Sequence, residues 1–123
     1  MTFKTLNLSP EILRAVQDAG YKEPTAIQKK SIPHILKKEH ILATAQTGTG
    51  KTAAFVLPIL NYLTANKKKV KGPKVLIVSP TRELAAQITD SIKIYSRYLK
   101  LFSVTVTGGM SYQLQNKLLS KPI

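Results

Sequence analysis

The sequence predicts an α/β fold of three layers, with parallel strands between helices. Apolar, strand-like runs at 40–44, 75–78 and 102–107 alternate with stretches of helical periodicity. Such alternation is typical of a parallel sheet that is covered by helices on both faces. The run at 75–78, Val-Leu-Ile-Val, is apolar throughout, as expected of a strand buried on both faces.

Two helices are expected before the first strand. Ser9-Pro10 supplies an N-cap and a proline at the first helical position, ahead of an apolar stripe that ends at Gly20. Pro24-Thr25 opens the second helix. Pro33 is expected to kink or interrupt that helix, because proline lacks a backbone N–H.

Three further helices are expected later in the chain. The first follows a glycine-rich loop and contains Pro58, and a basic turn region at 66–74 separates it from the second strand. An apolar repeat from Leu84 to Leu99 predicts the next helix. The segment from Met110 to Leu119 predicts the last one.

The segment 45–52, Ala-Gln-Thr-Gly-Thr-Gly-Lys-Thr, has the pattern of a phosphate-binding loop and lies between strand-like and helical segments. Gly48 and Gly50 let backbone N–H groups approach a polyanion closely. Lys51 is expected to neutralise the phosphates, and Thr52 to bind Mg²⁺. The sequence therefore predicts a nucleoside triphosphate bound by Gln46, Thr47, Gly48, Thr49, Gly50, Lys51 and Thr52.

The chain is strongly basic, with 19 Lys and Arg against 6 Asp and Glu and a net charge of +13. This charge favours a polyanionic partner, either nucleic acid or an anionic membrane surface, although a merely solubilising surface would also explain it. The lack of cysteine excludes a disulfide framework and a thiolate metal site. No apolar run is long enough to span a bilayer, so we expect a soluble, cytoplasmic protein.

Three further motifs accompany the phosphate-binding loop. Residues 20–28, Gly-Tyr-Lys-Glu-Pro-Thr-Ala-Ile-Gln, match a Q motif, which extends to an isolated upstream aromatic residue, Phe3. Residues 80–85 match motif Ia, and Gly108-Gly109 match a double-glycine motif. With these motifs the chain resembles the start of a DEAD-box ATP-dependent RNA helicase of bacterial type. The resemblance implies that residues 1–123 are the N-terminal portion of the first RecA-like (P-loop NTPase) domain.

The resemblance implies that ATP and Mg²⁺ are held by the phosphate-binding loop together with the Q motif at 3–28. Gln28 would read adenine, because one amide donor and one acceptor match the N6/N7 edge of adenine and mismatch guanine. Phe3 would pack on the adenine ring, and Tyr21, Lys22 and Thr25 would shape the same pocket. Outside such a motif, Gln28 would be a solvent-facing helix residue and Phe3 a hydrophobic anchor.

The resemblance also implies an RNA-binding edge. Motif Ia lies where a predicted parallel strand ends and a helix begins, which is the functional edge of an open sheet. Backbone N–H groups, a hydroxyl and a guanidinium at that edge suit phosphate. The implied RNA-binding residues are Pro80, Thr81, Arg82, Gly108 and Gly109. A local alternative is that Arg82 and Glu83 only cap and charge a helix start, and that the glycines form a plain turn.

The sequence contains no Asp-Glu-Ala-Asp box, no Ser-Ala-Thr motif and no second RecA-like domain. Phosphoryl transfer needs an acidic residue for Mg²⁺ and a group that positions water. Residues 1–123 are therefore expected neither to hydrolyse ATP at a useful rate nor to unwind RNA alone. Because the family places the acidic-box strand among those found here, we expect a truncated sheet with exposed edges. Residues 1–123 are then expected to be marginally stable by themselves, to self-associate, or to be the ordered part of a longer protein.

Two other functions are compatible with parts of the sequence. A different phosphate-loop enzyme, such as a small-molecule kinase, would leave Gln28 and the segment 80–85 unexplained, and it should not bind RNA. A non-catalytic basic module would bind RNA or a partner protein, and its RNA affinity would depend neither on Lys51 nor on nucleotide.

Overall fold

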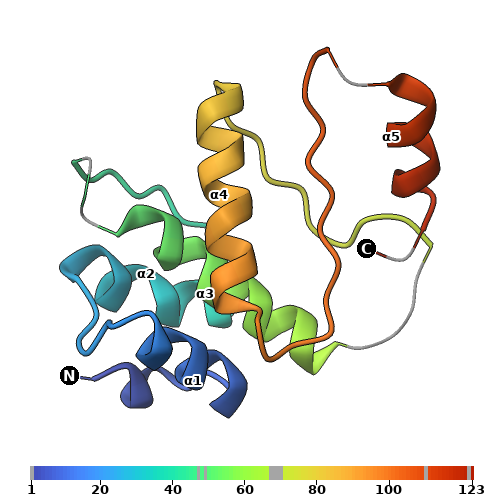
Figure 1. Ribbon diagram of the computed structural model, residues 1–123. Coiled ribbons are helices and arrows are strands. Elements are labelled where there is room, and N and C mark those ends of the chain that lie inside the picture. The colour runs from blue at the N-terminus through green and yellow to red at the C-terminus, as the bar shows by residue number, and fades with distance from the viewer. Residues whose placement is uncertain (1, 47, 49, 67–70, 110, 122) are drawn as a thin grey trace.

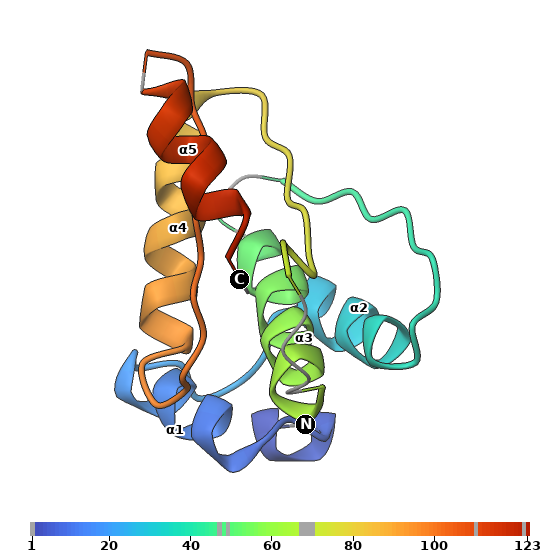
Figure 2. The ribbon, with the colours of Figure 1, turned by 90° about the vertical axis from the view of Figure 1, so that its right-hand side faces the viewer.

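The computed structural model describes residues 2–46, 48, 50–66, 71–109, 111–121 and 123. Helices dominate the described part of the chain, and α3 lies at its centre (Figure 1). A view turned by 90° shows α5 in front of α4 (Figure 2). In chain order the helices are η1 (Phe3–Leu6), α1 (Pro10–Asp18), α2 (Ala26–Leu36), α3 (Lys51–Ala65), α4 (Arg82–Tyr95) and α5 (Tyr112–Leu119).

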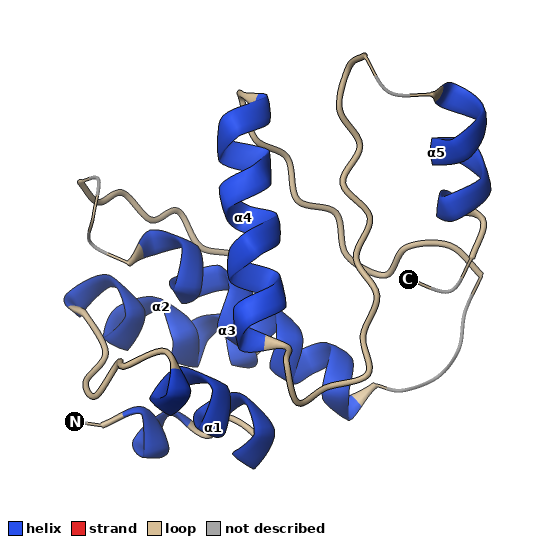
Figure 3. Ribbon diagram, in the orientation of Figure 1, coloured by secondary structure: helices blue, strands red, loops and turns tan. Residues whose placement is uncertain are grey.

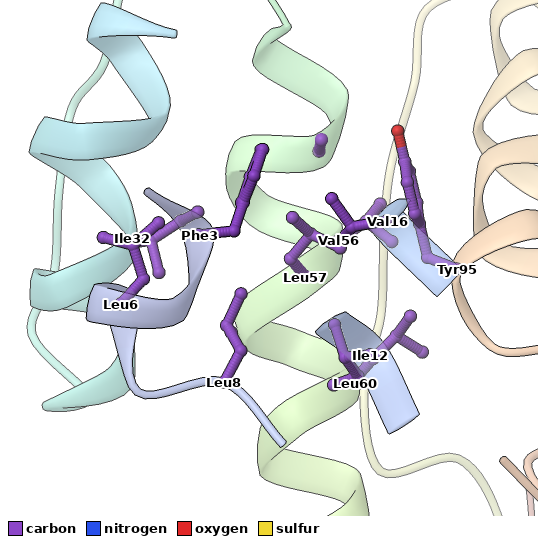
Figure 4. Close-up of a cluster of buried hydrophobic side chains, with 11 residues drawn as sticks. Phe3, Leu6, Leu8, Ile12, Val16, Ile32, Val56, Leu57, Leu60 and Tyr95 are labelled. Carbon is purple, nitrogen blue, oxygen red and sulfur yellow. The ribbon is translucent and has the colours of Figure 1, made fainter. Parts of the chain in front are cut away.

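The hydrophobic core lies where α3 meets η1, α1, α2 and α4 (Figure 4). Ile12, Ile32 and Leu57, one each from α1, α2 and α3, have no exposed side-chain surface. Burial of such aliphatic side chains is the main favourable contribution to folding. The helices before residue 66 thus fold around α3, and the other labelled members of this cluster are Phe3, Leu6, Leu8, Val16, Val56, Leu60 and Tyr95.

A polar cluster on the surface joins α1 to the segment that follows α4. The hydroxyl of Tyr98 donates to a carboxylate oxygen of Asp18. The guanidinium carbon of Arg14 lies 4.2 Å from the centroid of the Tyr98 ring, within the range of a cation–π contact. These contacts connect α1 to the C-terminal side of α4 outside the apolar core.

The helices begin and end close to where the sequence predicts them. Ser9 and Thr81 are the N-cap residues of α1 and α4, and Thr81 Oγ1 accepts a hydrogen bond from the N–H of Leu84 at 3.1 Å. One detail differs: Pro33 does not interrupt α2, which continues to Leu36. We attribute this continuity to the burial of Ile32 in the contact between α2 and α3.

The three predicted strands at 40–44, 75–78 and 102–107 are not formed among the described residues (Figure 3). These segments are extended, but a strand requires a neighbouring strand that takes up its N–H and C=O groups. The described residues offer them no such ladder. Two of the extended segments nevertheless run between α4 on one side and α5 on the other (Figure 1).

An apolar groove of about 720 Å³ separates these two extended segments. Its walls are residues 73–82 and 101–108, and α3 and α4 supply Val56, Leu60 and Ile88. The last described residues meet one wall, because the N–H of Gly72 donates to the carbonyl of Lys121 at 3.2 Å and the N–H of Lys74 donates to that of Ile123 at 3.2 Å. From the first bond to the second, the donor moves from residue 72 to 74 and the acceptor from 121 to 123. The residue numbers rise together, which is the pattern of parallel pairing.

Each helix in the described part of the chain is too short or too polar to cross a lipid bilayer.

Replacing Leu57 by Ala should lower the free energy of unfolding by about 2–5 kcal/mol, because it leaves a cavity in a fully buried position. Urea titration followed by circular dichroism measures the change. Leu42→Ala is the matched control: its side chain is 96% exposed, so its effect should stay within about 0.5 kcal/mol. Equal losses in both variants would contradict the location of the core around α3.

Candidate nucleotide and nucleic-acid site

Gln28 connects the start of α2 to the loop that precedes α3. Its Oε1 accepts a hydrogen bond from the backbone N–H of Thr25 at 3.0 Å, and its Nε2 donates to the carbonyl of Gly50 at 3.1 Å. The side chain is only 3% exposed. A buried amide without partners would be costly, so these two bonds fix the helix and the loop relative to each other.

The same glutamine is part of a capping box. Thr25 is the N-cap of α2 and Gln28 its third helical residue, and each side chain bonds the other's backbone. The spacing Thr-x-x-Gln is the sequence signal of this device. The Q motif and the capping box share this segment, and the capping box is an additional local reason for Gln28 to lie close to Thr25.

Gly50 allows the close approach of Gln28. A Cβ atom at this position would lie 2.4 Å from Gln28 Nε2, and the backbone has φ +82°, in the left-handed region. Gly48 has a similar φ of +84°, but a Cβ atom there would meet nothing within 4 Å. Both glycines therefore satisfy a backbone requirement, and only Gly50 also satisfies a packing requirement.

Lys51 and Thr52 lie in the first turn of α3, where the backbone N–H groups have no intrahelical acceptors. Lys51 is exposed and makes no ion pair with any other described residue. An ammonium group beside a helix N-terminus attracts anions such as phosphate. Of the remaining predicted loop residues, Gln46 is exposed, and Thr47 and Thr49 lie outside the described residues.

Thr52 is half-buried, and the described residues contain no cluster of three or more His, Cys, Asp or Glu side chains around it or elsewhere. A single hydroxyl is a weak ligand for Mg²⁺, which prefers several oxygen ligands. The side chains at this site therefore fit Mg²⁺ only together with phosphate oxygens.

The upstream Q-motif residues are distributed between the core and the surface. Phe3 is 6% exposed and packs in the core cluster (Figure 4), which is the arrangement of a hydrophobic anchor. Its contact with adenine stays a prediction. Lys22 and Thr25 are exposed and lie on either side of the buried Pro24.

Tyr21, the aromatic residue of the Q motif, is exposed and lies beside Tyr95 at the end of α4. The ring centroids are 6.5 Å apart, and the planes are tilted by 47°. Burial raises the pKa of Tyr95 to about 12, and the neighbouring Tyr21 contributes to the increase. The buried Tyr95 thus packs against the exposed Tyr21, a contact that no local sequence pattern indicates.

Arg82, the first residue of α4, lies against the double glycine. Cβ atoms placed on Gly108 and Gly109 would be 3.9 and 3.7 Å from its guanidinium nitrogens. Arg82 is exposed and forms no ion pair within the described part of the chain. The structure therefore brings together an exposed guanidinium and backbone without side chains, and binding of RNA by these residues stays a prediction.

The neighbouring residues keep this arrangement in place. Thr81 is occupied as the N-cap of α4, and Pro80 before it is exposed. Farther along α4, the hydroxyls of Thr89 and Thr105 are 2.5 Å apart and form a hydrogen bond. This bond ties the extended segment 101–107 to the helix, so the glycines that follow lie near Arg82. No motif in the sequence indicates this contact of Thr89 with Thr105.

Comparison with known proteins gives a consistent result. The family model described as DEAD/DEAH box helicase matches residues 25–123. The chain is 43% identical over 112 residues to the ATP-dependent RNA helicase SrmB of Haemophilus influenzae, which covers 90% of this chain and 26% of that protein. It is 41% identical over 119 residues to the ATP-dependent RNA helicase DeaD of Escherichia coli, which covers 96% of this chain and 18% of that protein.

Solved structures show the same similarity. A DEAD box protein from Methanococcus jannaschii superposes with a TM-score of 0.86 at 39% identity, over 98% of this chain and 32% of that one. The RNA helicase Prp28 from Chaetomium thermophilum, crystallised with ADP, gives a TM-score of 0.85 at 37% identity, over 98% of this chain and 30% of that one. The chain thus spans about a third or less of each of these four proteins.

Replacing Gly50 by Ala should destabilise the protein more than the same change at Gly48. Each alanine must adopt a left-handed backbone at a cost of about 1–2 kcal/mol, but only Ala at position 50 displaces the Gln28 amide. Breaking that bond to a buried amide should add about 1–3 kcal/mol. Urea unfolding of both variants measures the difference. Equal destabilisation would show that Gln28 does not depend on Gly50.

Proposed function

Because this chain belongs to the DEAD/DEAH box helicase family, we propose that it carries the ATP-binding elements and part of the RNA-binding elements of an ATP-dependent RNA helicase. Such an enzyme separates short RNA duplexes locally. The relatives SrmB and DeaD are named as ATP-dependent RNA helicases, which supports the proposal. The structural observation that carries it is the bridge of Gln28 between the Q motif and the phosphate-binding loop.

The hydrogen-bonding capacity of Gln28 suits adenine. A side-chain amide has two donor hydrogens and two acceptor lone pairs. The structure uses one hydrogen for Gly50 and one lone pair for Thr25. One donor and one acceptor remain, and these are the groups that pair with N7 and the N6 amino group of adenine. Gln28 can therefore hold the loop and read the base at the same time.

The other residues predicted to bind nucleotide precede Gln28 in the Q motif or lie at the start of α3. Lys51 supplies positive charge to the phosphates, and Thr52 supplies a hydroxyl to Mg²⁺ that the phosphates hold in place. Tyr21 and Lys22 belong to the rim of the base pocket. The sequence 1–123 contains no acidic box, so we propose that these residues by themselves bind ATP without hydrolysing it.

The RNA backbone is assigned to Arg82, Gly108 and Gly109, with Pro80 and Thr81 shaping the turn before α4. A guanidinium next to bare backbone N–H groups is suited to phosphate oxygens. The net charge of +13 supports an RNA partner. We place the protein in the cytoplasm, where RNA helicases of this kind meet their substrates.

The extended segments at 75–78 and 102–107 are proposed to be strands of a parallel RecA-like sheet in three layers. The support is the groove between them and the hydrogen bonds of Gly72 with Lys121 and of Lys74 with Ile123, which follow a parallel pattern. A further strand seated in the groove would complete the hydrogen bonding of both walls. Without it, the exposed apolar residues of the walls, among them Leu76 and Val78, favour self-association of residues 1–123.

A competition titration tests the nucleotide assignment on this chain. A fluorescent ADP analogue is displaced by ATP and then by GTP, each with Mg²⁺. We expect ATP to compete at least about tenfold better than GTP, because the free donor and acceptor of Gln28 mismatch guanine.

Lys51→Ala is the control for the phosphates. It should weaken both nucleotides alike, because they share the phosphate chain. Equal competition by ATP and GTP would contradict adenine reading by Gln28 while leaving the phosphate-binding loop intact. Unchanged nucleotide affinity in Lys51→Ala would contradict phosphate binding by the loop. No nucleotide binding by the original protein would contradict the whole nucleotide assignment.

A further inference from the structure

An aromatic side chain lies exposed next to the double glycine. Tyr112, the first residue of α5, is 82% exposed. It lines a small cavity of about 180 Å³ together with Gly108 and Gly109. The structure shows no ring contact and no side-chain hydrogen bond between Tyr112 and the other described residues. A large aromatic ring held outside the core leaves its faces available to a ligand.

We propose that Tyr112 is a stacking platform for a nucleobase of single-stranded RNA. This inference rests on the proposed RNA-binding function, and it adds a base contact to a site otherwise suited to the sugar-phosphate chain. Proteins that hold single strands combine positive charge along the backbone with aromatic rings on which bases stack. Here the two components adjoin the same pair of glycines.

Arg82 supplies the charged component. Its guanidinium lies 3.7–3.9 Å from the positions that Cβ atoms would occupy on the two glycines. It makes no ion pair inside the described part of the chain, so a phosphate oxygen can replace water there. A phosphate held by Arg82 and the Gly108–Gly109 backbone places the attached nucleotide beside the cavity that Tyr112 lines.

The chemistry at Tyr112 predicts how the site treats different bases. Every base has a π-face, so stacking on a tyrosine tolerates any sequence. None of the described residues that line the cavity is charged, and the amide of Gln115, which also lines it, belongs to a buried side chain. The site should therefore grip RNA of any sequence more firmly than the backbone contacts alone would, and it should lose that increment when the bases are removed.

The test compares variants of this chain by fluorescence anisotropy with a single-stranded oligouridine and with the matching abasic ribose-phosphate oligomer. Tyr112→Ala should weaken binding of oligouridine by about 5- to 100-fold. Tyr112→Phe should bind like the original protein, because the ring face is kept. On the abasic oligomer, the Ala variant and the original protein should bind equally.

Two controls separate base stacking from phosphate binding and from general effects of removing a tyrosine. Arg82→Ala should lower the slope of log affinity against log salt concentration by about one unit, whereas Tyr112→Ala should leave that slope unchanged. Tyr62→Ala removes a part-exposed tyrosine from α3, whose ring has the ammonium of Lys38 5.3 Å from its centroid. This variant should bind oligouridine normally.

The outcomes distinguish failure of this inference from failure of the proposed function. If the original protein binds oligouridine and Arg82→Ala weakens it, but Tyr112→Ala does not, the stacking platform is overturned and the RNA site stands. Equal losses for Tyr112→Ala on both oligomers would also overturn stacking. If the original protein binds neither oligomer at low salt, the RNA function and the inference are overturned together.

Discussion

The hydrogen bonds of the buried Gln28 amide are the constraint on which the rest of the structure depends. Both ends of a buried amide need partners, and here the partners belong to two elements, Thr25 before α2 and Gly50 before α3. Gly50 must be a glycine because of its left-handed φ and the nearness of the amide. α2 and α3 start from this junction and pack along each other, and η1 and α1 cover the pair. The loop proposed to bind nucleotide is thereby attached directly to the hydrophobic core.

The second site depends on a different kind of contact. Arg82 and the double glycine are far apart in the sequence, and they meet because the hydroxyls of Thr89 and Thr105 tie the extended segment 101–107 to α4. That segment has no strand partner among the described residues. Its position therefore rests on side-chain contacts with one helix, where a paired strand would also have a ladder of backbone bonds.

The sequence was sufficient for the helices, because their signals are local. Ser9-Pro10, Thr25 and Thr81 mark N-termini by side-chain chemistry that acts within one turn. Motifs placed the phosphate-binding loop before α3 and assigned Arg82 and Gly108 to the same ligand, but they did not indicate that these two residues lie next to each other. The strands at 40–44, 75–78 and 102–107 were not recovered, because apolar composition identifies an extended segment but pairing requires a partner elsewhere. For the same reason no local pattern indicated that Tyr95 would support Tyr21.

These contrasts divide the molecule into a well-packed part and an under-packed part. Gln28, Gly50 and the start of α3 belong to the first, where side chains such as Leu57 are fully buried. The double glycine and Tyr112 belong to the second: Gly108 ends one wall of the open apolar groove, and Tyr112 begins α5. Local opening is easiest where few apolar contacts and few backbone bonds hold a segment. The proposed nucleotide contacts of Gln28 and Lys51 should therefore keep their geometry in the free protein. The proposed RNA contacts of Arg82 and the double glycine should gain theirs when strand or ligand contacts fix the groove walls. The proposed nucleotide site would then be preorganised, whereas the proposed RNA site would become ordered when RNA binds.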